Sequence, residues 1–294
     1  MTQRQSRSII HEVWLFCNLF LMFIFSCNLA LAKDVVPVPL GVAVPQFFDP
    51  GRHRAKPEFF AIRHLRFITS ADDPPFHFAL PDGTLTGFDV DLARHICLVL
   101  RVTCTVQVRR PDTAGAVLAK GEADALLTSR PINRLDRNVF DATAPYYRQP
   151  ARFLGRRDNK LSAASPDSLA GKQIGVLAGS AESAFLARYF PKARARFFHS
   201  PANMLAALHD GDVDLAFGDA IAFSFWLNGS LAQGCCKFVG GPYLAPAYFG
   251  DGVAIAVAKG NAPLRRALDY ALERIAQNGT FTDLYLKYFP VGYF

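Results

Sequence analysis

The amino-acid sequence predicts an α/β protein built from two similar halves. From Leu65 onward, short apolar runs typical of strands alternate with longer segments of helical periodicity, which favours a mainly parallel sheet. Two segments, Lys120-Gly-Glu-Ala-Asp-Ala-Leu-Leu127 and Asp210-Gly-Asp-Val-Asp-Leu-Ala-Phe217, also share one pattern: an apolar helix, a glycine turn, an aspartate and a buried strand. Ligands in such sheets bind beyond the carboxyl ends of the strands, so two halves that face each other would line a shared cleft. The alternative is chance similarity, because Gly-x-x-Asp is a common turn.

The first 60 residues carry features of export and not of a folded domain. Residues 13–32 are apolar, follow Arg4 and Arg7, and end in Ala-Leu-Ala, which predicts a signal peptide over residues 1–32. A retained membrane anchor is the alternative, and a lipid anchor at Cys27 is a weaker one. Residues 33–60 contain five prolines without a clear period and are interpreted as a Pro-rich leader lying over or ahead of the first domain. An exported chain would be periplasmic.

Composition narrows the function classes. The 294 residues suffice for one large or two modest domains, and 51% hydrophobic with 19% charged residues is typical of a well-packed globular protein. The formal charge of +7 comes from dispersed basic residues without an aromatic-interleaved stripe, so nucleic-acid binding is not supported. No spacing resembles a metal site, and no cofactor is expected.

The segment Gly171-Lys-Gln-Ile-Gly-Val-Leu-Ala-Gly-Ser-Ala-Glu182 predicts a strand, a glycine turn and the start of a helix. Unpaired backbone N–H groups and the helix dipole would then point at one spot and favour an anion there. The alternative is an ordinary strand-to-helix connection with Ser180 as its N-cap.

Four cysteines remain beyond the predicted signal. Cys97 lies on the apolar face of a helix and Cys104 in the alternating strand 103–108, so an oxidising compartment favours a disulfide between them. Cys235 and Cys236 are adjacent, and the sequence does not place them. Near the C-terminus, Asn261 caps a helix that ends at Gly279, and a shorter helix is expected over 280–289.

The order of these features resembles the bacterial periplasmic solute-binding proteins of polar-amino-acid ABC transporters, the extracellular solute-binding protein family 3. The resemblance covers residues 65–289. The segments that carry it include Gly87-Phe-Asp-Val-Asp-Leu92, Asp124-Ala-Leu-Leu127, Ala144-Pro-Tyr-Tyr147, Gly171-Lys-Gln-Ile-Gly-Val-Leu-Ala-Gly-Ser180, Tyr248-Phe-Gly-Asp-Gly252 and Asn278-Gly-Thr280.

The resemblance implies a two-lobe periplasmic binding protein of type II with two hinge crossovers, which closes like a Venus flytrap. The first lobe would comprise residues 61–147 plus 250–294 and the second residues 152–240, with crossovers near 147–149 and 241–250. Such a protein is a monomer, captures an amino acid or related carboxylate solute, and delivers it to an inner-membrane ABC permease. It is not an enzyme and needs no cofactor.

In the second lobe, the resemblance assigns Asp219 to the ligand α-ammonium. The alternative is that Asp219 only caps the helix over 220–226. The strand end and helix start that approach the ligand would be Leu177, Gly179, Ser180 and Ala181, with Glu182 as a further candidate.

In the first lobe, the resemblance places Thr128 and Ser129 near the ligand carboxylate. Pro131 replaces a hydroxyl residue of the family and has no N–H to donate. The carboxylate-binding arginine is best matched by Arg137, which assumes a one-residue insertion, while Arg130 and Arg134 remain candidates. A guanidinium suits a carboxylate because two parallel hydrogen bonds fix its orientation.

Two aromatic positions of the family are occupied here by Asp73 and Pro111. A carboxylate at Asp73 would suit a cationic or hydroxyl-bearing ligand, although an exposed turn residue is equally consistent, and Phe76, Phe78 or Phe88 could supply an aromatic surface instead. Asp73 also carries an alternative function, that of proton donor in a periplasmic cyclohexadienyl or arogenate dehydratase on the same fold. A third reading is a ligand sensor that contacts a membrane receptor.

Overall fold

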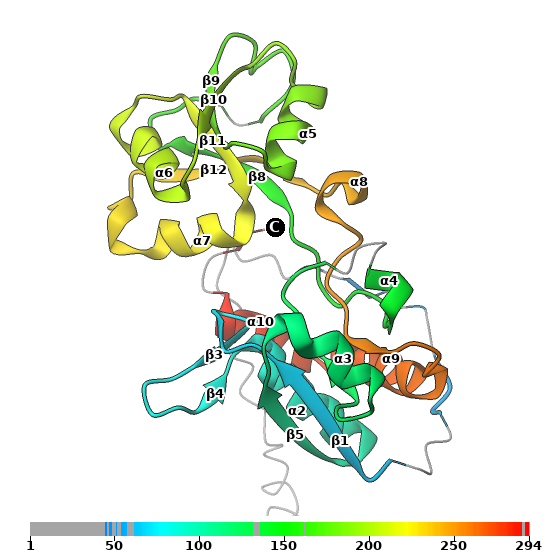
Figure 1. Ribbon diagram of the computed structural model, residues 1–294. Helices are drawn as coiled ribbons and strands as arrows, with labels where there is room; N and C mark the ends of the chain where they lie inside the picture. The colour runs from blue at the N-terminus through cyan, green and yellow to red at the C-terminus, as the bar shows by residue number, and fades with distance from the viewer. Residues whose placement is uncertain are drawn as a thin grey trace, which may run out of the picture. The chain divides into compact units, whose positions relative to one another are not determined.

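A computed structural model describes residues 45, 47–48, 51, 54–57, 62–131, 136–161, 163–289 and 292–293, with the backbone alone at residues 136 and 137 (Figure 1). These residues belong to one compact unit, Val42–Phe294. The predicted signal peptide and Arg134 lie outside the described residues.

The first lobe is organised around a five-stranded sheet. Its strand order is β5-β1-β6-β13-β7, and β1 pairs in parallel with both β5 and β6, whereas β13 is antiparallel to its neighbours. The bounds are β1 His64–Thr69, β5 Thr103–Val108, β6 Ala125–Leu126, β7 Phe140–Ala142 and β13 Ala256–Ala258.

The second lobe repeats this plan. Its strand order is β10-β9-β11-β8-β12, and β9 pairs in parallel with β10 and β11, whereas β8 is antiparallel to β11 and β12. The bounds are β8 Ala151–Arg156, β9 Gln173–Leu177, β10 Arg194–Phe198, β11 Leu215–Asp219 and β12 Cys236–Tyr243. The two segments whose sequences share a pattern therefore enter equivalent strands, β6 and β11, which confirms two α/β halves on one plan.

Helices cover both faces of each sheet because successive strand residues point to opposite sides. In β11, Leu215 and Phe217 pack with the side chains of α5, while Ala216 between them packs with those of α6. In β1, Phe67 packs against α2 and α9, and Ile68 against α3. The helices are α2 Phe88–Leu100, α3 Ala114–Ala119, α4 Asp136–Val139, α5 Ala181–Tyr189, α6 Pro201–Asp210, α7 Ala220–Asn228, α8 Pro246–Phe249, α9 Ala262–Gln277 and α10 Thr280–Tyr288, with short 3-10 turns at Pro111–Thr113 and Ser230–Ala232.

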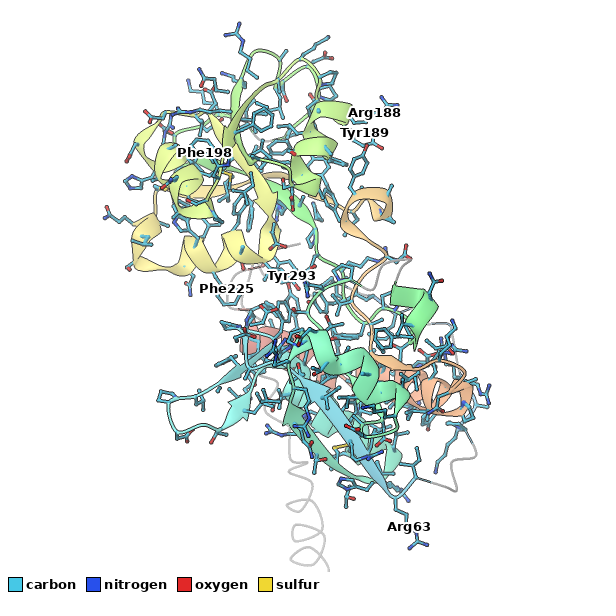
Figure 2. All side chains as sticks on the ribbon, in the orientation of Figure 1. Arg63, Arg188, Tyr189, Phe198, Phe225 and Tyr293 are labelled. Carbon is cyan, nitrogen blue, oxygen red and sulfur yellow. A yellow bond between two sulfur atoms is a disulfide. The ribbon has the colours of Figure 1, made fainter. Side chains whose placement is uncertain are left out.

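The helix starts follow from capping side chains. Ser180, Ser200 and Asn261 each accept a hydrogen bond from the backbone N–H three residues later, which satisfies one of the free donors of the first turn. At the other end of α5, Arg188 and Tyr189 project outward (Figure 2), with the Arg188 guanidinium carbon 5.9 Å from the centre of the Tyr189 ring.

Two segments connect the sheets, one from β7 to β8 and one from β12 back to β13. They contact each other through an antiparallel bridge between Tyr147 and Val253. The return connection follows Tyr243, because β12 continues past an irregularity and pairs Tyr243 with Ala151.

A small hairpin sheet flanks the first lobe. It contains β2 Asp72–Asp73, β3 His77–Ala79 and β4 Leu85–Thr86 in antiparallel pairing. Gly87 follows β4 with a φ of 128°, and a Cβ there would lie 2.3 Å from the carbonyl oxygen of Phe76, so this close approach requires glycine.

Both cysteine pairs form disulfides. Cys97 of α2 bonds to Cys104 of β5 across a Cα–Cα distance of 6.2 Å, as the sequence predicted. Cys235 bonds to its neighbour Cys236 at the start of β12, a pairing that the sequence analysis left open.

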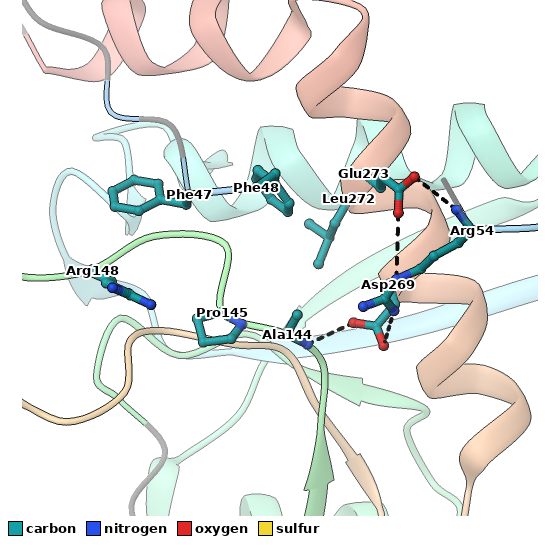
Figure 3. A pocket seen from close by; sticks show the side chains of 9 residues that line it. All are labelled: Phe47, Phe48, Arg54, Ala144, Pro145, Arg148, Asp269, Leu272 and Glu273. Carbon is teal, nitrogen blue, oxygen red and sulfur yellow. Dashed lines mark hydrogen bonds and ion pairs between the residues drawn. The ribbon is translucent and has the colours of Figure 1, made fainter. Parts of the chain in front are cut away.

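The described residues of the predicted leader include several that pack against the first lobe. Phe47 and Phe48 pack edge-on against Phe281, with ring centres 6.1 and 5.8 Å away. Arg54 reaches two carboxylates of α9: its Nη1 lies 2.6 Å from Asp269 Oδ2, and its backbone N–H donates to Glu273 Oε1 at 3.0 Å (Figure 3). Both carboxylates belong to buried residues, and a buried charge is tolerated only with a partner.

Asp269 also binds the backbone near the first connection between the sheets. Its Oδ1 accepts a hydrogen bond of 2.7 Å from the backbone N–H of Ala144, which lies just before the first connection between the sheets (Figure 3). Arg265, one turn earlier in α9, adds a longer contact of 3.3 Å to the same carboxylate. The leader, α9 and the start of the connection are therefore joined through one carboxylate.

Replacing Arg54 with methionine is expected to lower the free energy of unfolding by about 3 kcal/mol, because Asp269 and Glu273 lose their shared guanidinium while remaining buried. Urea denaturation of the purified protein measures this change. Lys56→Met is the matched control in the same leader, since Lys56 is exposed and should tolerate the same substitution within about 0.5 kcal/mol. Equal stability of the two variants would show that the leader contact is unimportant.

Candidate functional site

The first lobe contains a cavity of about 550 Å³ at the carboxyl ends of its parallel strands. Thr69 and Ser70 line it at the end of β1, Arg109 just beyond β5, and Thr128 and Ser129 beyond β6. This is the edge at which α/β sheets bind ligands. The other lining residues are Asp72, Asp73, His77, Pro111, Ala114, Leu126, Leu127, Arg130, Pro131, Phe140 and Ala256.

Asp73 and Ser129 meet in this cavity. The hydroxyl of the buried Ser129 donates to Asp73 Oδ2, so two predicted site residues that are far apart in sequence lie in direct contact. Behind them, the Tyr147 hydroxyl donates to the Ser129 carbonyl at 2.9 Å. Thr128 turns its Oγ1 toward the backbone N–H of Arg130 at 3.2 Å.

A buried polar cluster supports the same wall. His77 Nδ1 lies 3.2 Å from Asp89 Oδ2, and the Tyr146 hydroxyl donates to Asp89 Oδ1 at 2.8 Å. Burial raises the pKa of Asp89, and burial together with the neighbouring Asp89 charge raises the pKa of the Tyr146 phenol well above its usual value. The partner of His77 is thus Asp89 of the Gly-Phe-Asp-Val-Asp-Leu motif.

Of the three arginines predicted as candidates for holding a ligand carboxylate, the structure describes the side chain of Arg130. Arg137 lies in α4, where the structure describes the backbone only, and Arg134 lies outside the described residues. Arg130 lines the cavity and is exposed. Arg109 also lines it, which the sequence analysis missed, although its place directly after β5 was a usable signal.

None of the three phenylalanines expected as possible aromatic surfaces of the site lines the cavity. Phe76 and Phe88 are buried in the first core, and Phe78 does not line the cavity. Phe140, at the start of β7, supplies a ring to the cavity wall instead. It was missed because its position after α4 gave no sequence signal. Pro111 lines the cavity where the family has a ring.

The second lobe presents the predicted strand end and helix start. β9 ends at Leu177, Gly179 adopts a φ of 70°, and Ser180 caps α5, which begins at Ala181. A Cβ at Gly179 would meet no atom within 4 Å, so its positive φ, and not crowding, favours glycine there. The Ser180 hydroxyl accepts from the Ser183 N–H at 3.1 Å, which leaves the earlier N–H groups of the first turn without an intrahelical partner.

Asp219 lies next to this helix start. It ends β11 and caps α7 by accepting a 2.8 Å hydrogen bond from the Ala222 N–H, so the predicted capping role is present. Asp219, Leu177, Ser180 and Glu182 line one hollow of about 90 Å³. Burial, with a contribution from the Glu182 charge, raises the pKa of Asp219 to about 6, and no side chain that the structure describes forms an ion pair with this carboxylate.

Among the residues that the structure describes, no cluster of histidine, cysteine or carboxylate side chains could hold a metal ion. In the same part of the chain, no helix has the length and apolar character needed to cross a membrane.

Residues 65–291 match the bacterial extracellular solute-binding proteins, family 3, and the chain belongs to this family. One relative is the L-arginine-binding protein of Pseudomonas aeruginosa PAO1, 31% identical over 79% of this chain and 90% of that protein. Another is the histidine-binding periplasmic protein of Escherichia coli K12, 29% identical over 77% of this chain and 88% of that protein.

Among solved structures, the fold is similar to the L-cystine solute receptor of Neisseria gonorrhoeae in its unliganded open conformation. The TM-score is 0.68 at 21% identity, over 77% of this chain and 92% of that chain. The chain therefore has the two-lobe fold of the type II periplasmic binding proteins, as predicted. It is a solute-binding protein and not an enzyme.

Replacing Asp219 with asparagine should stabilise the ligand-free protein at pH 7.5. A carboxyl whose pKa is raised in the folded state binds its proton more tightly there, so stability is lost as the pH rises from the unfolded value of 3.8 through about 6. Asparagine keeps the helix cap but carries no charge. The variant should therefore be more stable than the original protein at pH 7.5, and the difference should vanish near pH 4.

Urea denaturation across this pH range measures the difference, with the exposed Asp212→Asn as a control that leaves the profile unchanged. If the difference in unfolding free energy between the Asp219 variant and the original protein did not change with pH, Asp219 would not be desolvated.

Proposed function

We propose that this protein captures a basic amino acid, with arginine as the leading candidate, between its two lobes and delivers it to an ABC permease. The observation that carries the proposal is a pair of carboxylates. Asp219 in the second lobe has no cation partner among the described side chains, and Asp73 lines the first-lobe cavity. A basic amino acid supplies one cation for each of them.

The α-amino end of the ligand would bind at the second lobe. Its ammonium would pair with Asp219, and the pKa of Asp219, which burial raises to about 6 in the ligand-free protein, would fall. Leu177, Gly179, Ser180 and Ala181 would approach the same end, where the helix N-terminus of α5 favours the negative ligand carboxylate.

The ligand carboxylate would also contact the first lobe. Thr128 and Ser129 offer hydroxyl and backbone groups at the cavity wall. The proposed guanidinium partner is Arg137, with Arg130 and Arg134 as the other candidates. Binding both lobes at once would drive closure, because a ligand shifts a conformational equilibrium only by binding one state better.

The side chain of the ligand would bind near Asp73. A carboxylate at a position where the family has an aromatic ring supports a cationic group there, and a guanidinium can donate two parallel hydrogen bonds to one carboxylate. The relatives support the same class, since they are named for binding arginine and histidine.

Cellular location belongs to the same proposal. Residues 1–32 would direct export and be removed before Lys33, and the mature monomer would work in the periplasm. The names of its relatives as periplasmic binding proteins support this location. The lobes would comprise residues 61–147 plus 250–294 and residues 152–240.

A thermal-shift and calorimetry screen of L-arginine, L-ornithine, L-histidine, L-citrulline and L-glutamate tests the proposal. At 100 times its dissociation constant, arginine should add about 2.7 kcal/mol to the free energy of unfolding. Asp219→Ala should abolish the shift for every amino acid, whereas the exposed Asp212→Ala should leave it unchanged.

Asp73→Asn should weaken the binding of arginine by about tenfold or more relative to that of citrulline, because only arginine carries a side-chain charge. An undiminished arginine shift in Asp219→Ala would refute the ammonium assignment. Tighter binding of glutamate than of arginine would refute the basic ligand class.

A further inference from the structure

We propose that the hollow beside Asp219 is a subsite for a small alkyl group on the α-nitrogen of the ligand, so that the protein binds amino acids with a secondary α-amine at least as well as their primary-amine parents. This inference rests on the proposed function, because it takes the ligand ammonium to pair with Asp219. It deepens that function by assigning a substrate class to the amino end, and it does not depend on which side chain the ligand carries.

The hollow lies at the carboxyl end of the second-lobe sheet, where β9 and β11 end and α5, α6 and α7 begin. This is the end of a parallel sheet at which ligands bind. Three of its lining residues, Leu177, Ser180 and Asp219, are also residues that the proposed function places at the amino end of the ligand. A group that binds Asp219 therefore lies next to the hollow.

The remaining wall of the hollow is apolar. Buried hydrophobic side chains form most of it: Met204 and Leu205 from α6, Phe217 from β11 and Phe223 from α7. An ammonium N–H turned toward these side chains would have no acceptor, which costs free energy. An alkyl group on the same nitrogen would instead gain free energy by leaving water. The chemistry of the wall thus favours carbon over N–H on this side of the ligand nitrogen.

Two small residues on either side of Asp219 leave this space open. Gly218 and Ala222 both line the hollow. A Cβ at Gly218 would lie 2.8 Å from Cζ of Phe223, so the ring of Phe223 takes the place that a larger side chain would need. Ala222 contributes a single methyl group. The volume of about 90 Å³ corresponds to about three water-sized groups, since one water takes about 30 Å³ in the liquid, and it suits a methyl or ethyl substituent.

The charges beside the hollow require that the nitrogen stay cationic. Asp219 and Glu182 both line it, and neither carboxylate forms an ion pair with a side chain that the structure describes. The Ser180 hydroxyl already accepts from the Ser183 N–H at 3.1 Å. A secondary ammonium keeps its positive charge and two N–H donors, so it can pair with Asp219 while its alkyl group fills the hollow. An amide nitrogen has no such charge.

Calorimetry of the original protein with L-arginine, Nα-methyl-L-arginine and Nα-acetyl-L-arginine tests the inference. The methylated ligand should bind about fourfold more tightly than arginine, the factor expected when one methyl-sized group leaves water for an apolar site. Nα-acetyl-L-arginine should bind about a hundredfold more weakly or worse, because its nitrogen cannot pair with Asp219. Weaker binding of Nα-methyl-L-arginine than of arginine would overturn the inference.

Ala222→Leu tests the location of the alkyl group. The larger side chain should occupy the hollow, while the backbone N–H that caps Asp219 is kept. The ratio of affinities for methylated and unmodified arginine should therefore fall by about tenfold or more, because the methyl group meets a filled space. Ala202→Leu is the matched control, since Ala202 is an exposed first-turn residue of α6 that does not line the hollow. It should keep the original ratio, and an unchanged ratio in Ala222→Leu would overturn the inference.

The two proposals can fail separately. If Ala222→Leu does not fold, the ratio measured in the original protein decides the inference. If arginine does not bind but another amino acid of the screen does, the proposed ligand is wrong, and the hollow is tested with the Nα-methyl form of the amino acid that binds. If no amino acid binds, the proposed function and the alkyl subsite are both rejected.

Discussion

A carboxylate that leaves water needs a cation or several hydrogen-bond donors, and this constraint organises the molecule. Asp89 is satisfied inside the first lobe by His77 and Tyr146. Asp269 is satisfied by Arg54 of the leader and by a backbone N–H. Asp219 accepts hydrogen bonds from the backbone at the start of α7 but has no cation partner in the described part of the chain, and burial raises its pKa to about 6. The first two carboxylates have their partners within the chain, whereas the third remains open to a partner from outside.

The architecture was largely predictable because it depends on local patterns. Apolar runs at strand period and helices of period 3.6 located the elements, and the repeated glycine–aspartate segment indicated two equivalent halves. The structure places these segments before β6 and β11, which occupy the same position in two sheets of identical order. Capping residues such as Ser180 and Asn261 located the helix starts for the same local reason.

Cavity-lining positions of the candidate site were predictable only where a residue follows a strand. Ser129 and Asp219 follow strands and line the cavity and the hollow, and the contact between Ser129 and Asp73 depends on the fold. The pairing of His77 with Asp89 was not foreseen, because it joins a hairpin strand to a helix across 12 residues. The Arg54 contact was harder still, since it spans 219 residues and starts in a segment without periodicity. Such contacts depend on tertiary packing, for which a sequence pattern has no signature.

The two disulfides have a consequence for mechanics. Cys97–Cys104 closes a short loop between α2 and β5 of the first lobe, and Cys235–Cys236 closes the smallest possible ring in the second lobe. Neither bond joins one lobe to the other, so oxidation can rigidify each half without adding a covalent tether across the hinge. The four cysteines of the described chain thus make the two lobes stiffer, while the two chain segments that connect them determine how freely they rotate.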